Sequence, residues 1–149
     1  MQTLGGIFMA KVRTVRSESI IKILKERLEG LFPDRVAVGD FDVERSTSEF
    51  RIFWHELIGR RKGIVSSMDC KDGRCEVSLI VDHATDEEIE ELKKLENLIE
   101  DMYKGVSCEI NTGLIAGGAS IVCYGGLEDL EPVYMDIIDH AYKLVERYR

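Results

Sequence analysis

The feature that most constrains the fold is a hairpin centred on Asp72-Gly73. Residues 64–70 and 75–81 alternate between apolar and polar side chains on either side of Lys-Asp-Gly-Arg. Asp-Gly is a preferred sequence for the type I′ turn, which joins two antiparallel strands. The apolar residues of the second strand share one face: Cys75, Val77, Leu79 and Val81. The chain is therefore expected to build an antiparallel sheet with one face against a core.

Amphipathic helices are predicted on both sides of this hairpin. The first begins near Ser17 and ends at Gly30, and the second begins at a capping box of Thr85 and Glu88 and ends at Gly105. Its apolar stripe is Ile89, Leu92, Leu95, Leu98, Ile99 and Met102. A third helix begins at Pro132. Its predicted buried residues are Val133, Ile137, Ile138, Ala141, Leu144, Val145 and Tyr148.

Further strands are predicted over residues 35–43, 106–111 and 120–124. Residues 46–62 fit a helix capped by Ser46 and Glu49, or a strand rich in aromatic and β-branched residues. We favour the strand because a meander fits the hairpin that follows. The expected fold is a single α+β domain over residues 1–149. It is a two-layer sandwich in which N-terminal, middle and C-terminal amphipathic helices cover an antiparallel sheet of five to six strands. Residues 1–8 are a possible disordered tail, since Met9 is as plausible a start as Met1.

Composition narrows the function classes. The chain has 20 basic and 28 acidic residues, so its net charge is −8. An acidic surface repels nucleic acid and anionic lipid, and neither is an expected partner. No apolar run approaches the ~20 residues of a membrane-spanning helix, and no signal peptide is recognisable, so we expect a cytoplasmic protein. One glutamine and two asparagines among many charged residues are typical of a thermophile.

The four cysteines form two pairs. The hairpin register places Cys70 opposite Cys75, and a second hairpin turning at Ile115-Ala116 places Cys108 opposite Cys123. We favour reduced, buried thiols that act as small apolar side chains. Cross-strand disulfides are the second possibility and a structural zinc or iron–sulfur site the third, because the spacing is not that of a zinc knuckle.

The histidines and glycines are weaker candidates. His55-Glu56 lacks the second histidine of a zinc protease motif, and His83 lies at a strand-to-helix junction. Asp136 and His140 are one helical turn apart and could share a proton or bind a metal with a third ligand, but we favour a solvated pair. Gly117 and Gly118 fit a hairpin turn better than a phosphate loop, since no Gly-Lys-Ser/Thr follows.

The order of elements is similar to that of type III secretion chaperones and their relatives. This resemblance implies a small acidic α+β protein that dimerises and binds segments of partner proteins. We expect a non-enzymatic protein-binding or chaperone-like domain in the form of a homodimer, with no cofactor and with Phe53 and Tyr103 as partner anchors if exposed. The alternative is a small enzyme or ligand-binding protein with a site at the strand ends, using His55, His83 or a cysteine and the glycines at 117 and 118. A third possibility is a cysteine-based redox or metal-dependent regulator.

Overall fold

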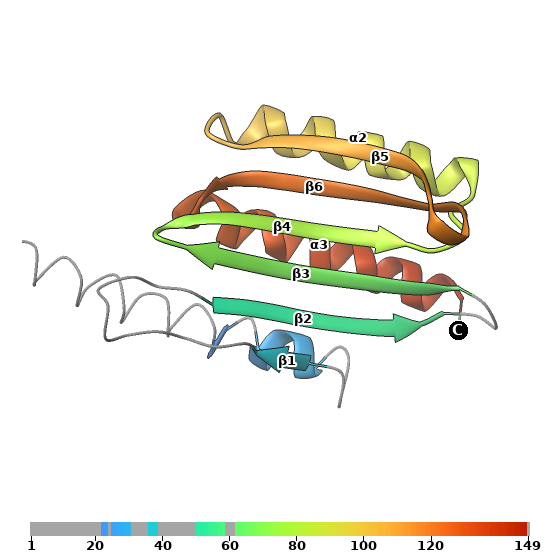
Figure 1. Cartoon of the computed structure of the whole chain (residues 1–149), viewed down its shortest axis with the longest axis horizontal. Coiled ribbons are helices and arrows are strands. Elements are labelled where there is room, and N and C mark those ends of the chain that lie inside the picture. The colour runs from blue at the N-terminus through green and yellow to red at the C-terminus, as the bar shows by residue number, and fades with distance from the viewer. Residues whose placement is uncertain (1–21, 24, 31–35, 39–49, 59–61, 149) are drawn as a thin grey trace, which may run out of the picture.

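A computed structural model of the chain describes residues 22–23, 25–30, 36–38, 50–58 and 62–148. Their strands form one antiparallel sheet in the order β1-β2-β3-β4-β6-β5 (Figure 1). The strands are β1 (Val36–Val38), β2 (Phe50–Leu57), β3 (Gly63–Lys71), β4 (Arg74–Val81), β5 (Ser107–Leu114) and β6 (Gly118–Gly126). The predicted α+β class with an antiparallel sheet is confirmed.

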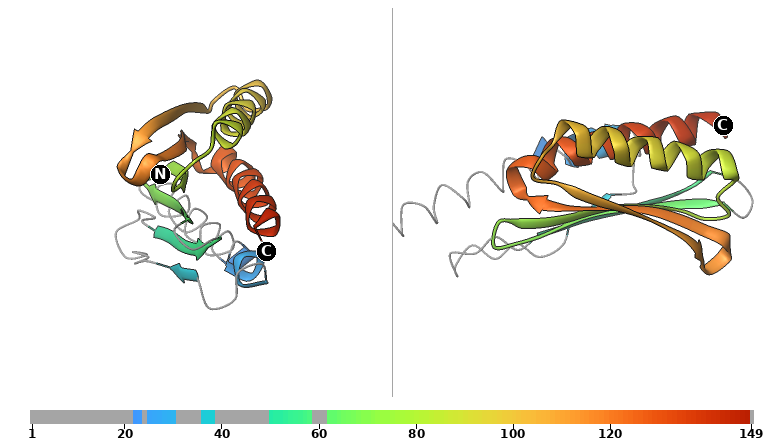
Figure 2. Two further views of the ribbon diagram at one scale, coloured as in Figure 1. Left: turned by 90° about the vertical axis from the view of Figure 1, so that its right-hand side faces the viewer. Right: turned by 90° about the horizontal axis from the view of Figure 1, so that it is seen from above.

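The two long helices lie on the same face of the sheet (Figure 2). Helix α2 (Asp86–Met102) runs along β5 and β6, and α3 (Leu127–Arg147) packs on β3, β4 and β6. A short 3₁₀ turn, η1 (Ile115–Gly117), joins β5 to β6. Residues 22–23 and 25–30 are also helical, as predicted. Within the described residues, no helix lies on the opposite face of the sheet (Figures 1 and 2).

Local sequence signals explain the centre of this sheet. Asp72 and Gly73 both have positive φ, 54° and 79°, as the type I′ turn requires. In β2, Ile52 and Trp54 are buried while Phe53 and His55 are exposed, so residues 50–57 form the predicted strand. Residues 1–8, Ser46 and Glu49 lie outside the described residues.

The helix boundaries differ from those predicted. Helix α3 begins at Leu127, so Pro132 is its sixth residue and not its first. The extra turn is stabilised because Leu127 and Leu130 are buried. Tyr148, predicted to be buried, is 41% exposed at the end of this helix. Helix α2 ends at Met102, before the predicted stop at Gly105.

The core lies between the helices and the sheet. The predicted apolar residues of α3 are buried apart from Tyr148, and Tyr134 joins them. In α2 only part of the predicted stripe faces the sheet: Leu92 and Ile99 are buried, whereas Leu98 and Met102 are 52% and 58% exposed. The predicted stripe is wider than the buried one, because a helix that lies along the sheet margin buries a narrower arc of its surface.

Candidate functional site

The four cysteines are paired in two disulfides. Cys70 bonds to Cys75 between β3 and β4, and Cys108 bonds to Cys123 between β5 and β6. Both pairs occupy directly opposite positions, with Cα atoms 4.2 and 4.0 Å apart. The predicted register is confirmed, but the expectation of reduced thiols is wrong, since both pairs are joined in disulfides. Their opposite positions on one face of the sheet bring the sulfurs within bonding reach. The thiolate is the form that attacks substrates or binds metals, so a redox or metal role of these residues requires prior reduction.

The residues proposed for a strand-end site are only partly brought together. His83 lies in the turn two residues after β4, in the left-handed region with φ 48°, and its backbone N–H donates to the carbonyl of Ala116 at 3.0 Å. The next amide, that of Ala84, donates to the carbonyl of Gly117 at 3.2 Å. His55 is not part of this cluster, because it lies opposite Val65 within the exposed face of the sheet.

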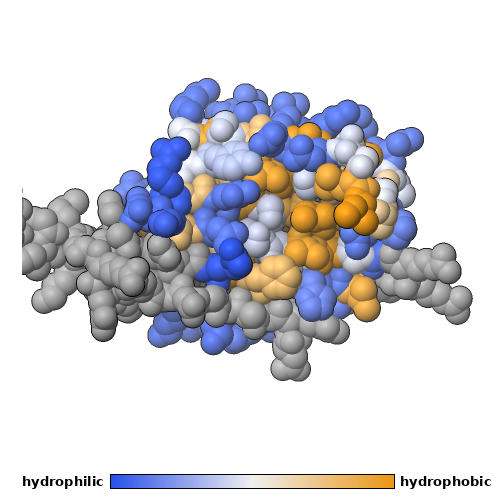
Figure 3. Space-filling model, viewed as in Figure 1, coloured by the Kyte–Doolittle hydropathy of each residue, from blue (hydrophilic) through white to orange (hydrophobic). Residues whose placement is uncertain are grey.

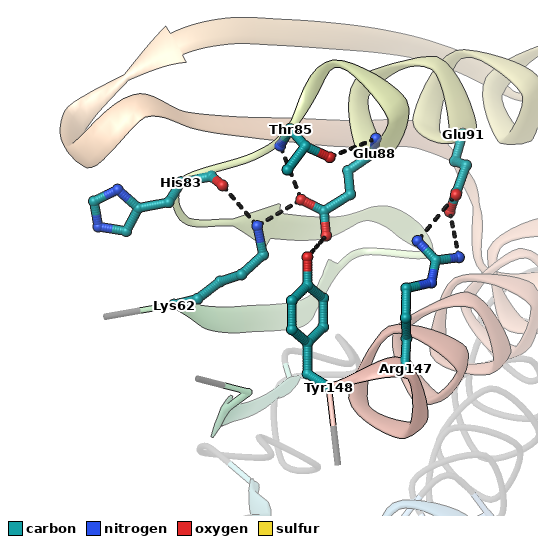
Figure 4. Close-up of polar contacts among 7 residues, drawn as sticks. All are labelled: Lys62, His83, Thr85, Glu88, Glu91, Arg147 and Tyr148. Atoms are coloured by element: carbon teal, nitrogen blue, oxygen red, sulfur yellow. Dashed lines mark hydrogen bonds and ion pairs between the residues drawn. The ribbon is translucent and has the colours of Figure 1, made fainter. Parts of the chain in front are cut away.

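A buried ion pair adjoins His83, and we call it and its partners the Lys62–Glu88 network (Figure 4). The Lys62 ammonium donates to Glu88 Oε1 at 2.5 Å and to the His83 carbonyl at 2.6 Å. The Tyr148 hydroxyl donates to Glu88 Oε2 at 2.9 Å. The Thr85 N–H donates to Glu88 Oε1, and Thr85 Oγ1 accepts from the Glu88 N–H, which completes the predicted capping box. The His83 ring points away from these groups (Figure 4).

The network connects three parts of the chain rather than exposing a reactive group. Burial raises the pKa of Glu88, but hydrogen bonds from Lys62, Thr85 and Tyr148 outweigh it and leave that pKa below its ordinary value. The ionised carboxylate is thus shared among the start of β3, the start of α2 and the end of α3. Each of its oxygens has a donor, so the network serves to hold these elements together.

The sequence indicates Glu88 as a helix cap but does not indicate Lys62 and Tyr148 as its partners. The capping-box spacing is a local signal, whereas the approach of Lys62 and Tyr148 depends on how distant segments pack. Nothing in the local pattern distinguishes Lys62 from an ordinary surface lysine.

A cleft of about 440 Å³ lies between α2 and α3, and we call it the α2–α3 cleft. Its lining residues are Glu91, Lys94, Leu95, Leu98, Asp136, Asp139, His140 and Lys143. Asp136 Oδ2 and His140 Nε2 are buried without a hydrogen-bond partner. Burial raises the pKa of Asp136, helped by the charge of Asp139, and burial lowers the pKa of His140. The structure therefore places this pair in a cleft and not on the solvated surface that we favoured.

No metal cluster accompanies these groups. Among the described residues, no set of three or more histidine, cysteine, aspartate or glutamate side chains is arranged to hold a metal ion.

The sheet face turned away from α2 and α3, here called the open face, carries large apolar side chains. Its central positions are Arg51, Phe53, His55, Leu57, Val65, Ser67, Asp69, Glu76, Ser78, Ile80, Ser107, Glu109, Ser120, Val122 and Tyr124. Phe53, Leu57 and Tyr124 are 41%, 67% and 38% exposed. Hydrophobic surface gathers around the middle of this face (Figure 3). An apolar surface of this kind is typical of an interaction site.

The two proposed anchors differ in position. Phe53 lies on the open face, whereas Tyr103 ends α2 and is half-buried against the core. Burial raises the pKa of its hydroxyl, with contributions from Asp136 and Asp129. An anchor must be exposed to reach a partner, and of the two residues only Phe53 is exposed.

Comparisons with protein-family models, curated proteins and solved structures find no match to this chain. No helix in the described part of the chain has the length and apolar character needed to cross a bilayer.

Proposed function

We propose that this chain is a protein-binding domain that self-associates into a homodimer through its open face. The observation that carries this proposal is the set of exposed apolar side chains on that face, which the two long helices leave uncovered. Pairing two such faces removes Phe53, Leu57 and Tyr124 from water and gains the free energy of apolar burial.

The size of the face fits a stable dimer. Five of its strands, β2 to β6, are eight or nine residues long. With strands ~4.8 Å apart and ~3.3 Å per residue, they span roughly 600 Å². Two copies bury roughly twice that area, which reaches the lower range of specific protein interfaces, about 1,200 Å².

Charge also favours a second copy as the occupant. The described charges on this face are Arg51, Lys71 and Arg74, which are positive, and Asp69, Glu76, Asp82 and Glu109, which are negative. Three positive and four negative charges leave a net charge of −1 on this face, whereas the whole chain has a net charge of −8. A nearly neutral face is the part of an acidic protein that meets its own copy with the least repulsion.

Self-association along the β5 edge is less favourable. The outward N–H of Cys108 already donates to the Glu100 carboxylate of α2, at 3.3 Å. Helix α2 also runs beside this strand, where it limits the approach of another strand (Figure 1). A carboxylate placed on an edge amide discourages strand addition.

Sedimentation velocity of two matched double variants tests the proposal. Phe53→Glu with Leu57→Glu places carboxylates on the open face, and the dimer is expected to dissociate at least about a hundredfold more readily because buried unpaired charges are costly. Leu98→Glu with Met102→Glu alters comparably exposed apolar residues of α2 and is expected to leave the dimer intact.

Circular dichroism checks that both variants keep the fold. A wild-type monomer at all accessible concentrations would contradict the proposal. A dimer that only the Leu98→Glu and Met102→Glu variant disrupts would contradict it as well.

A further inference from the structure

The α2–α3 cleft contains two polar atoms that find no hydrogen-bond partner in the described part of the chain. Asp136 Oδ2 and His140 Nε2 have no hydrogen-bond partner, although each belongs to a half-buried side chain that lines the cleft. A buried polar atom without a partner destabilises the fold, and native structures rarely keep one unless it meets a ligand or water. Both residues lie on the same side of α3, one helical turn apart.

In the described part of the chain, only some of the other charged residues of the cleft form ion pairs. Glu91 pairs with Arg147 at 3.0 Å, and Asp139 pairs with Arg27. Lys94 and Lys143 also line the cleft, and within the described residues neither forms an ion pair. Among the described residues, the cleft therefore offers one carboxylate oxygen without a hydrogen-bond partner and two cations without ion pairs.

Apolar surface completes the lining. Leu95 is partly buried against the core, and Leu98, on the next turn of α2, is 52% exposed. An aliphatic group in contact with both would be removed from water. The volume of about 440 Å³ is within the range of sites that bind small molecules.

We propose that the α2–α3 cleft binds a small zwitterion, an α-amino acid with an aliphatic side chain. Its ammonium group donates to the Asp136 carboxylate and to the imidazole of His140, once each side chain turns about its Cβ–Cγ bond to present Oδ2 and Nε2 to the cleft. Its carboxylate pairs with Lys94 and Lys143, and its side chain packs on Leu95 and Leu98. Each group of the ligand thus contacts a group of the cleft that has no partner among the described residues, or an apolar side chain with exposed surface.

Three related molecules test the assignment by titration into ¹⁵N-labelled protein. L-Leucine carries both charged groups, 3-methylbutylamine lacks the carboxylate, and 4-methylpentanoate lacks the ammonium. We expect saturable shifts of the amide signals of Leu95, Leu98, Asp136 and His140 with L-leucine, weaker binding of the amine, and the weakest binding of the acid.

Variants separate the two charged contacts. Asp136→Asn is expected to weaken binding of L-leucine and of the amine at least about tenfold, since it removes a charge-assisted hydrogen bond. Lys94→Met with Lys143→Met is expected to weaken binding of L-leucine and leave that of the amine unchanged. Asp101→Asn, at an exposed carboxylate of α2 outside the cleft, is the matched control and is expected to leave both unchanged.

The amide spectrum of each variant shows directly whether it is folded. Absence of saturable shifts with all three molecules would overturn the proposal and leave water as the partner of Asp136 and His140. Binding of L-leucine that is unchanged in the folded Asp136→Asn variant would overturn it too. These results do not depend on the oligomeric state, so they are distinguishable from those that test the open face.

Discussion

Replacing Lys62 by methionine tests the energetic role of the Lys62–Glu88 network. The Lys62 and Glu88 side chains are 11% and 2% exposed, so the change leaves a carboxylate buried without its ammonium partner. Removing one member of a buried ion pair typically costs about 3–5 kcal/mol. Thr85 and Tyr148 still donate to the carboxylate. We therefore expect the lower end of that range, about 3 kcal/mol of unfolding free energy.

Urea denaturation followed by circular dichroism measures this loss. The matched control is Arg147→Met, because the Arg147–Glu91 pair is 43% and 22% exposed and is expected to contribute less than about 1 kcal/mol. Adding Glu88→Gln to Lys62→Met removes the unpaired charge and should recover part of the loss. A loss for Lys62→Met no larger than that of the control would refute the reasoning.

Acid should weaken the same contact. Because the folded-state pKa of Glu88 is lowered, its contribution to stability is complete above the unfolded-state pKa of about 4.3 and is lost as pH falls through the folded-state value. Wild-type protein should therefore lose more stability than Glu88→Gln as pH is lowered from about 5 to 3. Equal losses in the two proteins would exclude Glu88 as a source of acid sensitivity.

The remaining predictions concern the disulfides and the packing of β6. Intact mass of protein purified without reductant should lie about 4 Da below that of the reduced chain, and an equal mass would show free thiols. The Cys108–Cys123 bond closes a loop with a sequence separation of 15, and the Cys70–Cys75 bond one of 5. Replacing the first pair by alanine should therefore lower the unfolding free energy by about 3 kcal/mol, and replacing the second pair by about 2 kcal/mol. A larger loss for the Cys70–Cys75 pair would contradict the chain-entropy argument. Gly125→Ala would place a Cβ 2.5 Å from Leu130 Cδ2 and 3.1 Å from the Gly105 carbonyl, and it should lower the unfolding free energy by about 1–3 kcal/mol in the same urea assay. An unchanged free energy would show that this packing is not tight.

The parts of the fold predicted correctly carry strong local signals. Asp72-Gly73 determines a turn type, and that turn determines the register that places Cys70 opposite Cys75. Thr85 and Glu88 mark the start of α2 through contacts within one turn of helix. Such features need no knowledge of the rest of the chain.

The errors arise where tertiary packing decides. Pro132 is a valid signal for a helix start, but burial of Leu127 and Leu130 extends α3 beyond it. Leu98 and Met102 fit the helical stripe and still face solvent, because periodicity does not specify how much of a helix the sheet covers.

In the candidate sites, too, local spacing could be predicted from the sequence and tertiary packing could not. The spacing of Asp136 and His140 predicts that they form a pair, whereas their burial in a cleft depends on α2 lying beside α3. The oxidation state of the cysteines also could not be predicted, since the register brings the sulfurs together but does not determine whether they are bonded.

Isotope-filtered NOE spectroscopy on a mixture of ¹³C-labelled and unlabelled protein tests most directly whether the open face meets a second copy. This measurement leaves the surface unaltered and detects methyl groups of one chain that lie close to the other. We expect intermolecular NOEs at the methyl groups of Val65, Ile80 and Val122, and none at Leu98. Absence of intermolecular NOEs at the three open-face residues, or NOEs confined to Leu98, would contradict it.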